Sequence, residues 1–214
     1  MPNALSVTDE KVVIACSVHY FQPFENSDVI VDAKPPLQPQ LWSQASAAYE
    51  DLFLKGTDAD VKFVVGNLEI PAHRVILAAR VPYFSKMMSS GMVEARSKEI
   101  KIDDCDAESF KRLLKYVYCA QLPDDLDSVA VKLLPLADKY DLPELKEACV
   151  HAMSKGLTRE NVCETLVAAD LYRCSNLRMK CLKSLSQWRS TMDSELLDVL
   201  SDFPKLLVEL LRMR

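Results

Sequence analysis

The chain has very few of the residues from which enzyme active sites are usually built. It contains 4 glycines and 3 histidines in 214 residues. No phosphate-binding glycine loop, dinucleotide fingerprint, His-Glu-x-x-His pair or Gly-x-Ser-x-Gly elbow occurs along it. Each of those sites needs glycine or histidine at a fixed spacing. We therefore expect a protein that is not an enzyme and that needs no cofactor.

An excess of positive charge and a long apolar run are also missing. The 31 acidic residues outnumber the 26 basic ones, which gives a net charge of -5. This balance disfavours nucleic acid as a partner, because a phosphate backbone attracts a basic surface. The longest apolar stretch, residues 12–21, is interrupted by Ser17 and His19, and it is shorter than the roughly 20 residues of a membrane span. Without a basic leader it does not resemble a signal peptide either.

The seven cysteines never have the Cys-x-x-Cys spacing of zinc or redox sites. Their odd number and their positions inside apolar periodic stretches favour buried free thiols over a disulfide framework, and so the nucleus or the cytoplasm. His73 begins an apolar helical stretch and has no second ligand spaced for it. We expect a core histidine satisfied by hydrogen bonds and not a metal ligand.

The chain divides at a proline-rich stretch. Residues 1–21 hold an alternating apolar strand pattern from Val12 to Tyr20, and a lone strand is not stable in water. Residues 22–40 carry 4 prolines and few large apolar side chains, which is typical of an extended linker. Apolar residues at helical spacing then predict a helix from Leu41 to Phe53.

A β-hairpin is predicted next. Apolar residues at positions 61, 63 and 65 alternate with Lys62 and Val64, and the alternation resumes from Leu68 to Ile70. Gly66 and Asn67 supply the positive-φ residues that a two-residue hairpin turn needs. Pro71 lacks a backbone N–H, so we expect the second strand to end before it.

The remaining patterns predict one short strand and a series of helices. Proline or a capping residue begins several of them, with Asp106, Thr158 and Ser175 as candidate N-caps. The strand is expected at residues 99–102, and the helices at residues 73–80, from 82, from 106, 128–140, 143–155, from 158, from 175, 195–200 and 204–213. A small sheet with many helices predicts an α+β fold.

Three stretches resemble the BTB/POZ domain family, and most closely its MATH–BTB branch, the speckle-type POZ proteins. The stretches are Ala72-His73 followed by Ile76-Leu77-Ala78-Ala79-Arg80, then Phe84-Ser85, and Ala137-Asp138-Lys139-Tyr140. The resemblance implies a BTB/POZ domain at residues 41–150, a small sheet with a helical cluster. It also implies an all-helical three-box or BACK-like segment at residues 151–214. Residues 1–21 resemble the last strand of a MATH domain, the substrate-reading sandwich of that branch.

The resemblance further implies a contact with cullin-3. Met92, Val93 and Glu94 match the apolar-x-Glu motif of cullin-binding family members, and the same surface is expected to include Met88 and Tyr118. An apolar knob would enter a groove on a partner helix, and the carboxylate would fix its orientation. Taken alone, the three motif residues fit a loop whose methionine packs on the core, and Tyr118 fits a core residue with a solvated hydroxyl group.

A twofold dimer is implied as well. Tyr49, Leu52 and Ile76 match positions that pack between two copies in this family. Ala45 stands at another such position, where a larger apolar residue is expected. This departure predicts either a looser dimer or a gap filled by Leu41 and Trp42.

Asp60 and Arg74 match a charged pair near the dimer seam of the family. We interpret them as a structural ion pair that supports the register, not as an acid and a base. Leu211 matches a position of a second self-association surface, where an aromatic residue is expected, so higher-order assembly stays open.

The resemblance thus implies a homodimeric adaptor that joins a cullin-3 RING ubiquitin ligase to protein substrates for degradation. Two other functions stay open. One is a scaffold, transcriptional or other, in which BTB self-association recruits further proteins. The second is a decoy that pairs with cullin or with related full-length BTB proteins but lacks the substrate reader.

Overall fold

The computed structural model describes residues 7–8, 11–12, 37–89, 97–188 and 200–212, in two units that divide after Leu37. In the first unit, β1 (Val7–Thr8) pairs antiparallel with β2 (Lys11–Val12). The strand predicted from Val12 to Tyr20 lies outside the described residues after its first position. Its pairing therefore stays a prediction.

All of α1 (Leu37–Lys55) except its first residue belongs to the second unit, and the helix begins before the predicted Leu41. Pro39 lies in its first turn, where the helix needs no N–H donor, so the proline-rich composition does not prevent the helix. Gly56 ends the helix with φ at +60° and donates its N–H to the carbonyl of Leu52 at 3.0 Å. A side chain on Gly56 would collide with the Pro71 ring, because its Cβ would lie 2.6 Å from that ring.

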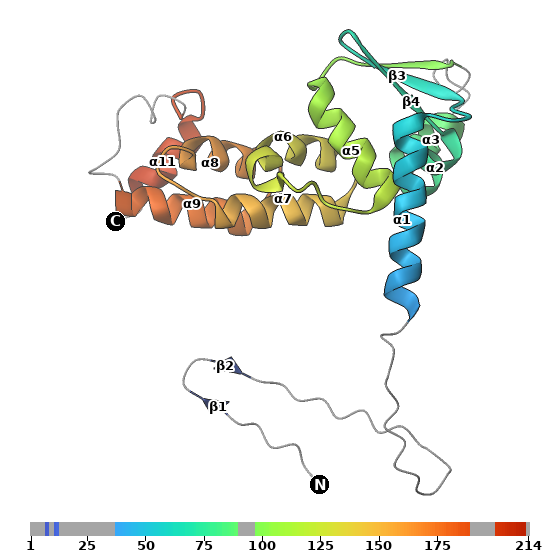
Figure 1. Ribbon diagram of the computed structural model, residues 1–214. Helices are drawn as coiled ribbons and strands as arrows, with labels where there is room; N and C mark the ends of the chain where they lie inside the picture. Colours follow the sequence, from blue (N-terminus) through green and yellow to red (C-terminus); the bar gives the residue numbers. More distant parts are fainter. Residues whose placement is uncertain (1–6, 9–10, 13–36, 90–96, 189–199, 213–214) are drawn as a thin grey trace, which may run out of the picture. The chain divides into compact units, whose positions relative to one another are not determined.

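A three-stranded sheet follows, in the order β4-β3-β5 (Figure 1). Strand β3 (Val61–Val65) pairs antiparallel with β4 (Leu68–Ala72) and parallel with β5 (Glu99–Ile102). Residues 61, 63 and 65 of β3 are buried and the two between them are not. The predicted alternation and the predicted strand at 99–102 are therefore confirmed.

Two details of the hairpin differ from the prediction. Strand β4 runs through Pro71, which pairs with Lys62, because β4 is an edge strand where a missing N–H needs no partner. Only Gly66 of the two turn residues has a positive φ, at 57°. Positive φ at the first central position alone is the pattern of a type II′ turn, so Asn67 needs no left-handed conformation.

Helices α3 (Pro82–Ser89) and α5 (Ala107–Cys119) pack against β3, and α2 (Arg74–Arg80) contacts both of these helices. An aromatic cluster joins β3, α3 and α5. The Phe63 ring lies 5.4 Å from Phe84 and 4.9 Å from Phe110, and Phe84 stacks on Tyr140 at 5.1 Å, measured between ring centroids. Asp106 caps α5 as predicted, since its carboxylate accepts the N–H of Ser109 at 2.9 Å.

The rest of the second unit is helical: α6 (Leu126–Lys139), α7 (Pro143–Lys155), α8 (Val162–Leu171), α9 (Ser175–Trp188) and α11 (Pro204–Arg212) (Figure 1). Helix α8 begins later than predicted. Asn161 precedes it, and Thr158 lies in the preceding turn, where its N–H donates to Asn161 Oδ1 at 2.8 Å. The helix predicted at 195–200 lies outside the described residues except for its last position. Helices and a small mixed sheet give the predicted α+β class.

Candidate functional site

An apolar groove lies where α1, α2 and the end of α5 meet, with a volume of about 830 Å³. We call it the α1–α2 groove. It brings together four of the residues predicted for the dimer interface, namely Ala45, Tyr49, Leu52 and Ile76. Tyr49 is 46% exposed, a high value for a large apolar side chain in a folded protein. Leu41 belongs to α1, but its side chain lies outside the described residues.

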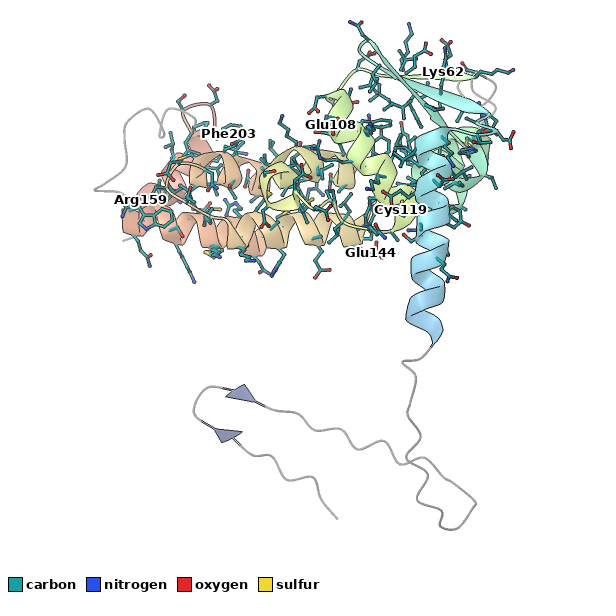
Figure 2. The ribbon with its side chains drawn as sticks, in the orientation of Figure 1. Lys62, Glu108, Cys119, Glu144, Arg159 and Phe203 are labelled. Atoms are coloured by element: carbon teal, nitrogen blue, oxygen red, sulfur yellow. The ribbon has the colours of Figure 1, made fainter. Side chains whose placement is uncertain are left out.

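Side-chain hydrogen bonds hold α1 against the end of α5. Ser46 Oγ donates to the carbonyl of Cys119 at 3.0 Å, and Gln121 Nε2 donates to Ser46 Oγ at 2.9 Å. Figure 2 shows Cys119 at the end of α5, beside α1. Phe53, buried on α1, packs its ring 5.1 Å from that of Tyr118. Ser46 and Gln121 could not be predicted from the sequence, because 75 positions separate them and neither belongs to a motif.

A hydrogen-bond network centres on Tyr118, whose side chain lines the groove. The Tyr118 hydroxyl lies 2.8 Å from both the backbone N and Nδ1 of His73, and His73 Nε2 lies 2.7 Å from the carbonyl of Thr57. A carbonyl only accepts, so Nε2 carries the proton and Nδ1 accepts from the Tyr118 hydroxyl. That hydroxyl accepts in turn from the His73 backbone. The prediction of a satisfied core histidine is confirmed.

Tyr118 is a core residue that is 4% exposed, and it lines the groove. Its predicted place beside the cullin surface stays a prediction. Its hydroxyl group was expected to be solvated, but both of its hydrogen bonds go to His73. Burial raises the pKa of Tyr118 to about 12, although the hydrogen bond from the His73 backbone acts in the opposite direction.

Asp60 and Arg74 meet through the backbone. Asp60 Oδ1 accepts the backbone N–H of Arg74 at 2.8 Å, at the first residue of α2. His73, the residue before α2, gives no side-chain cap, so Asp60 supplies that role from another segment. The Arg74 guanidinium donates to the carbonyl of Ser97. Asp60 therefore has a structural role, as predicted, but it acts as a cap for α2, where an ion pair with Arg74 was expected.

The cullin motif follows α3. Met92, Val93 and Glu94 lie outside the described residues, so their predicted contact stays a prediction. Met88 is half-buried near the end of α3 and packs on the core. Phe84 anchors the same helix and is fully buried. The motif thus stands between two fixed elements, α3 and β5.

Nucleophilic and metal chemistry have little support in the part of the chain that the structure describes. The six cysteines there are free thiols, and five of them are buried. Burial raises the pKa of Cys105 to about 11 and that of Cys149 and Cys181 to about 12. Among the residues that the structure describes, there is no group of three or more His, Cys, Asp or Glu side chains that could hold a metal ion. No described helix is long and apolar enough to cross a membrane.

Residues 49–157, just over half of the chain, match the family model of the BTB/POZ domain. The chain belongs to the BTB/POZ domain family. Its mixed sheet and surrounding helices are a BTB fold, as the resemblance implied. BTB domains self-associate and bind other proteins, and all residues that line the α1–α2 groove except Ala45 and Ser46 lie within the matched region. The match does not distinguish the MATH–BTB branch from others.

Similar proteins include BTB/POZ domain-containing protein 9 of Bos taurus and of Homo sapiens. Each is 42% identical to this BTB chain over 125 residues, or 57% of its length. The chain spans 20% of the length of these relatives. Among solved structures, the BTB domain of zebrafish PATZ1 is 21% identical with a TM-score of 0.44, and covers 57% of this chain and 96% of its own. The BTB domain of human gigaxonin is 22% identical with a TM-score of 0.42, and covers 62% of this chain and 98% of its own.

Proposed function

We propose that this BTB protein is the substrate adaptor of a cullin-3 RING ubiquitin ligase, acting as a homodimer. The observation that supports the proposal is the position of Met92, Val93 and Glu94 along the chain, between two elements of the BTB fold. They follow an α3 that Phe84 anchors in the core, and they precede β5 of the sheet. A recognition segment held at both ends loses less conformational freedom on binding than a free peptide would.

Each motif residue has a distinct physical role in this proposal. The Met92 side chain is flexible and polarizable, so it can fill an irregular apolar notch on a helical partner. The Glu94 carboxylate accepts a charge-assisted hydrogen bond that sets the orientation of the contact. A dimer would present two such segments, which raises the avidity for a ligase that itself engages several sites.

The α1–α2 groove supports the dimer. Its apolar lining and the exposed Tyr49 are the features of a surface that another protein covers. In an isologous dimer the same patch lies on both sides of the interface, so the α1 helices of two copies would lie against each other's grooves.

The adaptor does no chemistry in this proposal. Its six described thiols are free, and burial raises the pKa of each of them above the ordinary value. Partners are cullin-3, a second BTB chain and an unidentified protein substrate, in the nucleus or the cytoplasm. Neither nucleic acid nor a membrane is a proposed partner.

The MATH–BTB type is part of the proposal and rests on the sequence resemblance of residues 1–21. Transcripts whose reading frame continues upstream of Met1 into further sandwich strands would support it. If no such transcript exists in the source cells, the MATH–BTB assignment is wrong while the adaptor proposal stands. A chain that lowers ubiquitination of a substrate by a reconstituted full-length adaptor would instead be the decoy.

Binding to cullin-3 tests the adaptor function. Calorimetric titration of the purified chain with the cullin-3 N-terminal domain should give a Kd that rises at least about tenfold for Met92→Glu, and likewise for Glu94→Ala. Met179→Glu is the matched control for the methionine, because Met179 is 44% exposed on α9. Glu164→Ala on α8 is the control for the carboxylate. Unchanged affinity in both motif variants would refute the proposal.

A further inference from the structure

The hydroxyl of Tyr140 is buried without a hydrogen-bond partner in the part of the chain that the structure describes. Tyr140 follows the last residue of α6 and is 1% exposed, and its oxygen makes no hydrogen bond there. An unpaired buried polar group lowers stability, and folded proteins keep few of them. Phenylalanine would supply the same ring without that cost, so packing of the core does not explain a tyrosine at this position.

The charged groups beside Tyr140 pair with each other and not with its hydroxyl. Lys139 Nζ lies 5.1 Å from the centre of the Tyr140 ring and donates to both carboxylate oxygens of Asp104, at 2.9 and 2.7 Å. Burial, and after it the charge of Asp104, raise the pKa of Tyr140, so the hydroxyl keeps its proton. The group that would satisfy this donor is an acceptor oxygen.

Tyr140 packs against the first turn of α3, the helix that leads to the cullin motif. Its ring centre lies 5.1 Å from that of Phe84 and 5.2 Å from that of Tyr83. Tyr83 is 41% exposed, so this aromatic cluster reaches the surface, and Met92 stands three positions after the last residue of α3. Eight helical residues span about 12 Å, whereas a protein interface of ordinary size covers about 800 Å² on each partner. A partner bound at Met92 would therefore also cover α3 at Tyr83.

We infer that Tyr140 is a further specificity-determining residue for cullin-3, whose hydroxyl donates a hydrogen bond to an acceptor oxygen of the bound cullin domain; this rests on the proposed cullin binding and deepens it. In the free chain, Tyr83 and Phe84 cover the ring. Tyr83 is already partly solvated, so a change of its rotamer gives the partner access to the hydroxyl, and such changes are fast. Binding then satisfies a group that the free chain leaves unpaired, so the affinity gains what the stability of the free chain lacks.

Tyr140→Phe tests the inference, because it keeps the ring and removes only the hydroxyl. We expect the urea midpoint, followed by circular dichroism, to rise by about 0.5 M at an unaltered slope, since an unpaired buried group is lost. Calorimetric titration with the cullin-3 N-terminal domain should give a Kd about threefold to tenfold higher, since the complex loses one hydrogen bond. Tyr172→Phe is the matched control: Tyr172 follows α8 as Tyr140 follows α6, and it is half-buried. The control should change neither quantity.

A stabilised Tyr140→Phe variant that binds cullin-3 as tightly as the wild-type chain overturns the inference and leaves the adaptor function standing. A destabilised Tyr140→Phe variant overturns it as well, because the hydroxyl then has a partner in the free chain. Equal weakening of cullin binding by Tyr172→Phe would mean an indirect effect and has the same consequence. Failure of the adaptor function is seen separately: the wild-type chain and Met92→Glu then show the same affinity or none, and the inference falls with it.

Discussion

Replacing Tyr118 with phenylalanine should destabilise the BTB domain by about 2 to 3 kcal/mol. The change keeps the ring and its contact with Phe53, so no large cavity forms. It removes a hydroxyl that lies 2.8 Å from the backbone N and from Nδ1 of His73. His73 is 8% exposed, so its N–H loses its partner where water hardly reaches. An unsatisfied buried donor costs about 1 to 3 kcal/mol, and the lost bond to Nδ1 adds about 0.5 to 1.5 kcal/mol.

Urea unfolding followed by circular dichroism measures this change as a lower midpoint at an unaltered slope. Tyr116→Phe is the matched control. Tyr116 lies on the same helix, is half-buried and makes no hydrogen bond through its hydroxyl within the described residues. We expect that control to stay within about 0.5 kcal/mol of the wild-type chain. A Tyr118→Phe variant as stable as Tyr116→Phe would refute the network, as would an NMR spectrum showing the proton of His73 on Nδ1.

Three further predictions concern the helix cap, the groove and the thiols. Asp106→Ala should lower the free energy of unfolding in urea by about 1 kcal/mol. The hydrogen bonds from Ser109 lower the pKa of Asp106, so this stabilisation is present above the ordinary pKa of 3.8 and is lost as the pH falls through the lowered pKa. Leu52→Glu should weaken self-association at least about tenfold in sedimentation velocity, since it brings an unpaired carboxylate into an apolar interface, whereas Leu54→Glu, 65% exposed and outside the groove, should not. With its pKa raised to about 11 from 9.0, Cys105 should be alkylated about a hundredfold more slowly in the folded chain than in urea, as read by mass spectrometry. A loss of stability in Asp106→Ala that is the same at pH 3 and pH 7 would contradict the cap argument. Equal dimer affinities of Leu52→Glu and Leu54→Glu would contradict the interface at the groove. Equal alkylation rates of Cys105 in the folded chain and in urea would contradict the effect of its raised pKa.

Local sequence patterns predicted several elements of the fold. The alternation of residues 61–65 predicted a half-buried strand, and Asp106 was identified as an N-cap from its type and place alone. Both features depend on neighbours within a few positions in the chain. Ala45, Tyr49, Leu52 and Ile76 were grouped through the family resemblance, and the structure places all four around one groove.

Features set by distant parts of the chain could not be predicted in the same way. Pro71 stays in a strand because β4 lies at the edge of the sheet, and the strand order follows only from the assembled fold. Tyr118 and His73 are 45 positions apart, so no spacing rule could show that the hydroxyl satisfies the histidine and not solvent. Asp60 acts as a cap for α2 from 14 positions away, where a local N-cap would have been sought at His73.

The mass of the complex with cullin-3 tests the central claim most directly. The full chain and the cullin-3 N-terminal domain are mixed at micromolar concentration, separated by size exclusion and weighed by multi-angle light scattering. We predict one assembly that contains two BTB chains and two cullin domains, because a twofold dimer presents the Met92 segment twice. Separate elution of a BTB monomer and free cullin would contradict both the dimer and the adaptor function.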